Sequence, residues 1–203
     1  SRDDAREALK AGESLVDPDP HAALHPSGRA VVVPRGDAHA VLAPDGRELA
    51  RLGPFGDGAA GLCAFSPCGR HLLLHSHSDL EGLTVVLDAE AALHGRVEDA
   101  VALGAPSRLF SAAWLPEGPV VGDAHGYVQA WGRDASYRWR HFLGGSITGL
   151  AVHGDTLYAG TAAGTVHALA LTGGPDPWAL GDSPCVERWR WLLWAGEDAP
   201  LRW

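Results

Sequence analysis

Methionine is absent from the 203 residues, and lysine occurs once, at Lys10. The basic residues are therefore almost all arginine, which together with abundant alanine and glycine is typical of a protein encoded by a GC-rich bacterial genome. Because the chain begins at Ser1 and contains no methionine, we expect it to be a processed or excised piece of a longer product.

Cysteine is scarce, with three residues at Cys63, Cys68 and Cys185 and no Cys-x-x-Cys spacing. This pattern indicates neither a disulfide framework nor a zinc knuckle, and it favours a reducing compartment. No stretch approaches 18 consecutive apolar residues, so we expect no membrane insertion. The sequence thus predicts a cytoplasmic protein, with a removed export signal as the alternative.

Basic residues are outnumbered by acidic ones, 16 to 25, which gives a formal charge of −9. Such a surface repels a phosphate backbone unless the arginines cluster, and nucleic acid is therefore not expected as a partner. Helical signals are confined to the start, where the stretch 3–12 places two aspartates before an alanine-rich turn. We expect residues 1–20 to form an extension of a short helix and a proline-rich linker.

From residue 21 onward the chain consists of short apolar runs separated by Gly, Pro, Asp and Ser, which is typical of many short strands. One stretch recurs. "LHPSGRAVVV" at 24–33 matches "FSPCGRHLLL" at 65–74, "WLPEGPVVG" at 114–122 and "VHGDTLYAG" at 152–160. The spacing of the turn glycines is close to the roughly 40 to 45 residues of a four-stranded propeller blade. We expect the innermost strands at His21–Pro26, Gly61–Ser66, Ser111–Leu115 and Ile147–Val152.

The second half of each unit also recurs as strand, polar turn, strand and Leu-Gly, with "TAAGTVHALALTGGPDPWALG" at 161–181 as one copy. The second unit has extra residues between Leu87 and Val97, which we expect to form a loop or a helical turn. The predicted fold is all-β: a propeller of four to five four-stranded antiparallel blades, in a small or partial ring. Its units are 21–52, 53–104, 105–143 and 144–180, followed by a Trp-rich closing segment, 181–203.

At these residues the chain resembles WD-repeat and quinoprotein-type (PQQ-like) β-propellers, over about residues 21–180. "FSPCGRHLL" at 65–73 resembles the first hairpin of a WD repeat, and "GYVQAW" at 126–131 resembles its third strand. The stretch 157–178 is more similar to a quinoprotein repeat, and the Trp-Asp dipeptide is replaced by Trp131-Gly132. The resemblance implies radial blades and a protein or ligand that docks around the central channel. It does not specify a chemistry.

Histidines are the first candidate site, because His71, His75, His77 and Asp79 share one face of an expected strand. The spacing of His75 and His77 can chelate a metal, but a chain with eleven histidines produces such pairs by chance. We therefore expect a scaffold role and no metal or other cofactor. His39 and His125 recur in "DAHA" and "DAHG", which favours a structural hydrogen bond of the repeat.

No catalytic motif is present: Gly-x-Ser-x-Gly is missing, and the glycines of "GDGAAG" at 56–61 lack the lysine of a phosphate loop. The aspartates Asp37, Asp123 and Asp155 fall in expected turns, where Asp caps its own backbone. An enzyme, either a quinoprotein-like dehydrogenase or a hydrolase with calcium held by such carboxylates, stays the alternative.

The tail holds four of the eight tryptophans within residues 186–203. Trp189 and Trp191 alternate with Arg188 and Arg190, as in a strand with one apolar face, and we expect this strand to close or edge a blade. Trp and Arg are also enriched in interface hot spots. The predicted partner contacts are therefore Trp189, Arg190, Trp191, Trp194 and Trp203.

The function predicted from the sequence is that of a non-catalytic protein-interaction module or scaffold. Its partner is expected to be another protein or further domains of the same longer chain.

Overall fold

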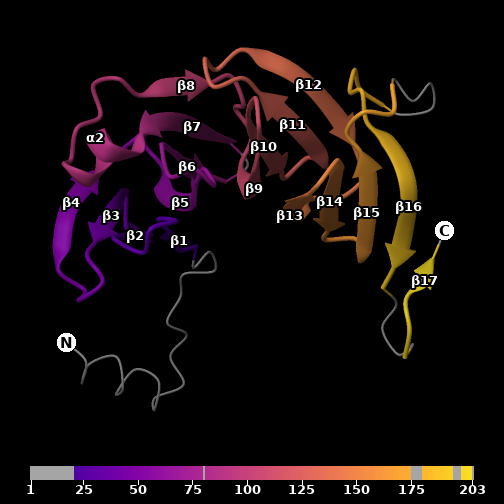
Figure 1. The fold of residues 1–203 in the computed structure, drawn as a ribbon, viewed down its shortest axis with the longest axis horizontal. Coiled ribbons are helices and arrows are strands. Elements are labelled where there is room, and N and C mark those ends of the chain that lie inside the picture. Colours follow the sequence, from indigo (N-terminus) through magenta and orange to yellow (C-terminus); the bar gives the residue numbers. More distant parts are fainter. Residues whose placement is uncertain (1–20, 80, 175–179, 194–197, 203) are drawn as a thin grey trace.

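Four antiparallel sheets make up the fold. The structure, a computed structural model, describes residues 21–79, 81–174, 180–193 and 198–202, so the expected N-terminal helix lies outside the described residues. Consecutive strands pair in chain order within each sheet. Figure 1 shows the sheets following one another along an open arc, with the first sheet at one end and the fourth at the other. We call the sheets blades one to four.

The strands of blade one are β1 (Ala23–Leu24), β2 (Val31–Arg35), β3 (Ala38–Leu42) and β4 (Glu48–Leu52). Blade two has β5 (Ala59–Phe65), β6 (His71–Ser78), β7 (Glu81–Asp88) and β8 (Val101–Leu103). Blade three has β9 (Leu109–Leu115), β10 (Gly118–Asp123), β11 (Tyr127–Trp131) and β12 (Tyr137–Phe142). Blade four has β13 (Ile147–His153), β14 (Thr156–Thr161), β15 (Thr165–Ala170), β16 (Val186–Leu192) and β17 (Leu201–Arg202). The four expected innermost strands coincide with β1, β5, β9 and β13 to within a few residues.

The fourth strand of blade four corrects one detail of the sequence analysis. The stretch 161–181 was expected to supply two strands, but its described residues supply no further strand after β15, and β16 is the strand that pairs with β15. The residues that follow β15 include "GGPDP" at 173–177. A proline cannot donate a hydrogen bond to a ladder, so this sequence is unsuited to a paired strand. The Trp-rich strand therefore forms the outer part of the last blade, where β17 pairs with it.

Helix α2 (Ala89–Leu93) occupies the insertion of the second unit, as expected. Asp88 caps it, because the Asp88 carboxylate accepts a hydrogen bond of 2.8 Å from the Ala91 N–H. Removing an N-cap side chain costs about 1 kcal/mol.

We expect Asp88→Ala to lower the free energy of unfolding by about 1 kcal/mol, because it leaves helix α2 uncapped. Asp88→Ser keeps a capping oxygen and is the matched control, with a loss of a few tenths at most. Urea denaturation of the two variants checks this. Equal losses in both would show that the cap contributes nothing.

The leucine run in β6 shows how a blade is buried on both faces. Leu72, Leu73 and Leu74 are each 0% exposed. Leu72 and Leu74 pack in the cluster between blades one and two, whereas Leu73 packs in the cluster between blades two and three. A strand buried on both faces has no polar side to alternate with, which is why the run is continuously apolar.

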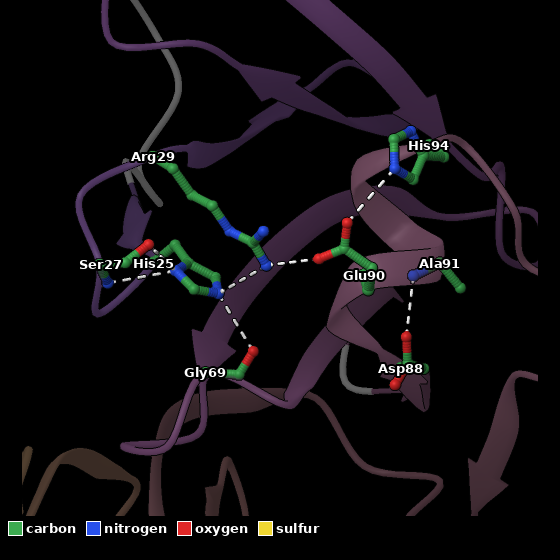
Figure 2. Close-up of polar contacts among 8 residues, drawn as sticks. All are labelled: His25, Ser27, Arg29, Gly69, Asp88, Glu90, Ala91 and His94. Carbon is green, nitrogen blue, oxygen red and sulfur yellow. Dashed lines mark hydrogen bonds and ion pairs between the residues drawn. The ribbon is translucent and has the colours of Figure 1, made fainter.

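The junction of blades one and two is also polar at one end, as Figure 2 shows. The His25 Nε2 lies 3.1 Å from the Gly69 carbonyl oxygen, and His25 Nδ1 accepts from the Ser27 N–H at 3.2 Å. Both contacts are satisfied when Nε2 carries the proton. Arg29 continues the junction with an ion pair of 2.6 Å to Glu90 in helix α2. A side chain at Gly69 would lie 2.8 Å from the His25 ring, so the close approach requires glycine.

Candidate functional site

A pocket lies where the first hairpins of blades two, three and four meet. Its volume is about 420 Å³. Blade two contributes Ser66 to Cys68 and His71, blade three contributes Trp114 to Pro116 and Arg133, and blade four contributes Val152 and Gly154. The same proline-and-glycine turns that marked the repeat in the sequence therefore build one shared surface. Each turn supplies a few atoms, and only the packing of three blades makes a concave site.

Trp114 and His71 form the apolar wall of this pocket. Their rings are stacked with centroids 6.0 Å apart and an angle of 18° between planes. Burial, together with the positive charges of Arg133 and Arg70, holds the pKa of His71 below its ordinary value. This shift favours the neutral form of His71, which suits contact with apolar groups. The indole N–H of Trp114 is buried and has no hydrogen-bond partner among the described residues.

Polar groups stand at the rim of the pocket. The exposed Arg133 donates from Nη2 to the Pro116 carbonyl at 2.5 Å, which fixes the position of its guanidinium group. The exposed thiol of Cys68 lies 3.5 Å from the Ser66 hydroxyl. That hydroxyl and the backbone at Arg70 lower the pKa of the thiol. The pocket thus combines apolar walls with a fixed cation, the pattern of a site that recognises an apolar side chain with an anionic group beside it.

Comparison with known proteins adds evidence on the fold. No family model matches the chain, and no curated protein matches it either. Among solved structures it is similar to the β-propeller domain of Myceliophteria thermophila Cps50 (Swd1), with a TM-score of 0.60 and 13% sequence identity. The match covers 82% of this chain and 56% of that one. The fold is that of a β-propeller. At this identity the similarity shows the fold alone. Membership of the WD-repeat or quinoprotein family stays a prediction.

His75 and His77 have structural surroundings in the propeller. His75 Nδ1 lies 2.9 Å from the Thr84 hydroxyl, and His75 Nε2 accepts a bond of 3.0 Å from the Leu109 N–H in blade three. Both ring nitrogens are thus used by the protein, and the imidazole links two blades. The His77 ring stacks beside the His75 ring with centroids 5.9 Å apart, so the two share one face, as expected. These contacts support the scaffold role.

The prediction that His39 and His125 hold equivalent positions in their blades is wrong, because the two lie in different environments. His39 is on β3 and is 0% exposed, whereas His125 is exposed in the turn after β10. The turn between β2 and β3 is shorter than the one after β10, so the two similar tetrapeptides are out of register. The side chain that organises the longer turn is Asp123, which accepts from the backbone N–H groups of His125 and Tyr127.

Two of the three turn aspartates, Asp123 and Asp155, have protein partners. Asp123 is buried and accepts a third bond of 2.8 Å from the Gln129 side chain. Asp155 pairs with Arg188 at 2.6 Å, and this bond holds the Asp155 pKa below its usual value. Among the described residues, no three His, Cys, Asp or Glu side chains are grouped so that they could hold a metal ion. Nor does any described helix have the length and apolar character needed to cross a membrane.

Two of the predicted partner residues lie together on one face of β16. The rings of Trp189 and Trp191 are 4.3 Å apart, and Tyr158 of β14 lies beside Trp189 at 5.9 Å. Arg202 of β17 covers Trp189 from 5.6 Å. Arg190 instead pairs with Glu187 at 2.6 Å. Trp194 and Trp203 lie outside the described residues.

The pocket residues Trp114 and Arg133 were not predicted from the sequence, and His71 was predicted only as part of the histidine group, not of this pocket. Arg133 and Trp114 belong to the same blade but are 19 positions apart, and His71 belongs to another blade. The proline-glycine turns were noted only as repeat markers. That these turns recur at one end of every blade was the one signal that could have indicated the site.

Proposed function

We propose that this chain is a non-catalytic protein-interaction module. It binds an extended segment of a partner protein at the pocket formed by the hairpins of blades two to four. The observation that carries the proposal is the convergence of three blades on one concave surface with an aromatic wall and a fixed arginine. The propeller fold supports it, since propellers commonly dock ligands on the face around their channel.

The pocket chemistry indicates the ligand. Apolar walls from Trp114, Leu115 and Val152 suit one large apolar side chain, and about 420 Å³ holds a side chain of this size. Arg133 at the rim favours a carboxylate next to that side chain, because guanidinium groups form charge-assisted hydrogen bonds with carboxylates. The expected motif is an aromatic or leucine residue that adjoins an aspartate or glutamate.

Selection from a peptide library displayed on phage tests this proposal. We expect enriched peptides to share an aromatic or leucine residue beside an acidic one. Arg133→Glu should weaken their binding at least about tenfold, equal to about 1.4 kcal/mol, because it turns attraction for the carboxylate into repulsion. Arg138→Glu makes the same charge change at an exposed position of β12 and should alter the affinity less than about twofold.

Isothermal titration calorimetry of one selected peptide gives both affinities. Enrichment without an acidic residue, or equal affinity for the Arg133 and Arg138 variants, would contradict the pocket as the binding site.

A further inference from the structure

The outer face of blade four resembles one side of a blade junction, but the part of the chain that the structure describes places no further blade against it. Register pairing places Tyr158, Gly160, Val166 and Trp189 on this face. Their counterparts in blade three are Val120, Gly122, Val128 and Trp139, which hold the same positions in the strand ladder. Those four are buried against blade four, whereas the residues of blade four are only half-buried.

Three glycines show the difference at atomic scale. A Cβ atom added to Gly122 would lie 2.5 Å from Ile147 Cγ2, because the next blade is packed against it. A Cβ atom added to Gly160 or to the neighbouring Gly149 would meet nothing within 4 Å. The face of blade four therefore has the small residues that close packing of a further blade requires, together with open space in front of them.

Among the described residues, none covers the complementary face of blade one. Leu24, Val31 and Leu42 point away from blade two, and they correspond in register to Val152, Leu157 and Leu169 of blade four. The latter set packs against blade three. In blade one Leu24 is 61% exposed, and Val31 and Leu42 are half-buried. The two ends of the arc thus carry the two halves of the junction that joins blades three and four.

We propose that two copies of this chain close into one eight-bladed ring. The outer face of blade four of each copy packs against the free face of blade one of the other. Each junction joins two different faces, and such head-to-tail contacts form a closed ring when the rotation returns to the start. Trp189 and Trp191, predicted from the sequence as partner contacts, lie on the blade-four face.

Blade number favours a second copy as the occupant. Propellers commonly have four to eight blades, and four blades from each of two chains give eight. The match to the solved propeller domain covers 56% of that domain, so the arc accounts for little more than half of such a ring. The part that completes it is about as large as the arc itself. The hairpin pocket lies on another surface, so the two proposals can fail independently.

Light scattering after size exclusion tests the assembly on the full chain. The expected mass is twice 21.3 kDa. Gly160→Glu should give a monomer with an unchanged circular-dichroism spectrum, because the new side chain meets open space in the single chain but blocks the junction. Leu24→Glu should also give a monomer. Val101→Glu, at a 41% exposed residue of blade two, is the matched control and should stay dimeric.

Mixing the two monomeric variants distinguishes the geometry. Gly160→Glu retains an intact blade-one face and Leu24→Glu an intact blade-four face, so the mixture should recover a dimer with a single junction. A wild-type chain that stays monomeric would overturn the proposal, as would open-ended oligomers. If Leu24→Glu leaves the dimer intact, blade four of one copy must contact blade four of the other. That outcome also overturns the proposal.

Discussion

Deletion of residues 186–203 is expected to lower the free energy of unfolding by about 3 to 5 kcal/mol and to promote aggregation. The deletion removes β16, which pairs with β15 along six positions, and it removes the ring of Trp189 that packs on Tyr158. A fully buried aromatic ring withdraws about 150 to 250 Å² from water, and the half-buried ring of Trp189 withdraws part of that area, so its loss adds to the cost of the lost strand. The backbone of β15 would then become an unpaired sheet edge, which invites association with other chains.

Thermal unfolding followed by circular dichroism measures the effect. For a chain of this length a loss of this size lowers the melting temperature by roughly 10 °C. A shorter deletion, of residues 198–203, removes β17 but keeps β16, and it should cost about 1 kcal/mol or less. Equal melting temperatures for the long deletion and the intact chain would show that β16 does not support the last blade.

Stability is expected to fall by about 4 kcal/mol between pH 7.5 and pH 5, because two buried histidines must stay neutral in the folded chain. His39 and His75 are each 0% exposed. Burial lowers the pKa of His39 to about 4, and backbone contacts with Gly61 and Leu62 offset this only in part. Burial lowers the pKa of His75 to about 3, and the charges of His77, His39 and Arg108 act in the same direction.

The direction of the effect follows from proton binding. In the unfolded chain a histidine has a pKa of about 6.5, so below that pH the unfolded state binds more protons than the folded one. The stability that each neutral histidine contributes is complete above pH 7. It is lost as the pH falls through 6.5 toward the folded pKa of 3 to 4. At pH 5 each histidine accounts for a loss of about 2 kcal/mol.

Urea denaturation at pH 7.5 and pH 5 provides the measurement. Burial raises the pKa of Glu187, but hydrogen bonds from His167 and Arg190 outweigh this and lower it to about 2. Its contribution is therefore lost mainly below pH 4.5, outside this window. His75→Gln removes one titrating group and should reduce the pH dependence by about half, although it lowers the stability at pH 7.5. A pH dependence equal to that of the intact chain would show that His75 is not the group that titrates.

The repeat was the part of the fold that sequence could predict. Pro and Gly at fixed places in "FSPCGRHLLL" fix a hairpin locally, because proline withholds a donor and the glycine adopts a left-handed turn. The continuous apolar run Leu72 to Leu74 signals burial on both faces without any knowledge of the neighbours. The last strand also followed from local pattern, since Trp189 and Trp191 must share a face at a two-residue period.

The candidate site depended on contacts between blades. His39 and His125 look equivalent in the sequence, yet one lies in a buried strand and the other in an exposed turn, because a shorter loop shifts the register. The partners of His75 are Thr84 within the blade and the Leu109 N–H from the next blade. No local pattern encodes the second contact.

The amino-acid sequence by itself determined the all-β class, the blade period and the strands that begin each blade, because turns and strand faces depend on neighbours in the chain. Tertiary structure alone decided three other features. It decided that Trp114, Arg133 and His71 share a pocket, that the arc of four blades stays open, and that Gly160 faces open space where Gly122 meets Ile147. These features depend on how one blade packs against the next. The residues that meet at such a junction lie some 40 positions apart in the sequence.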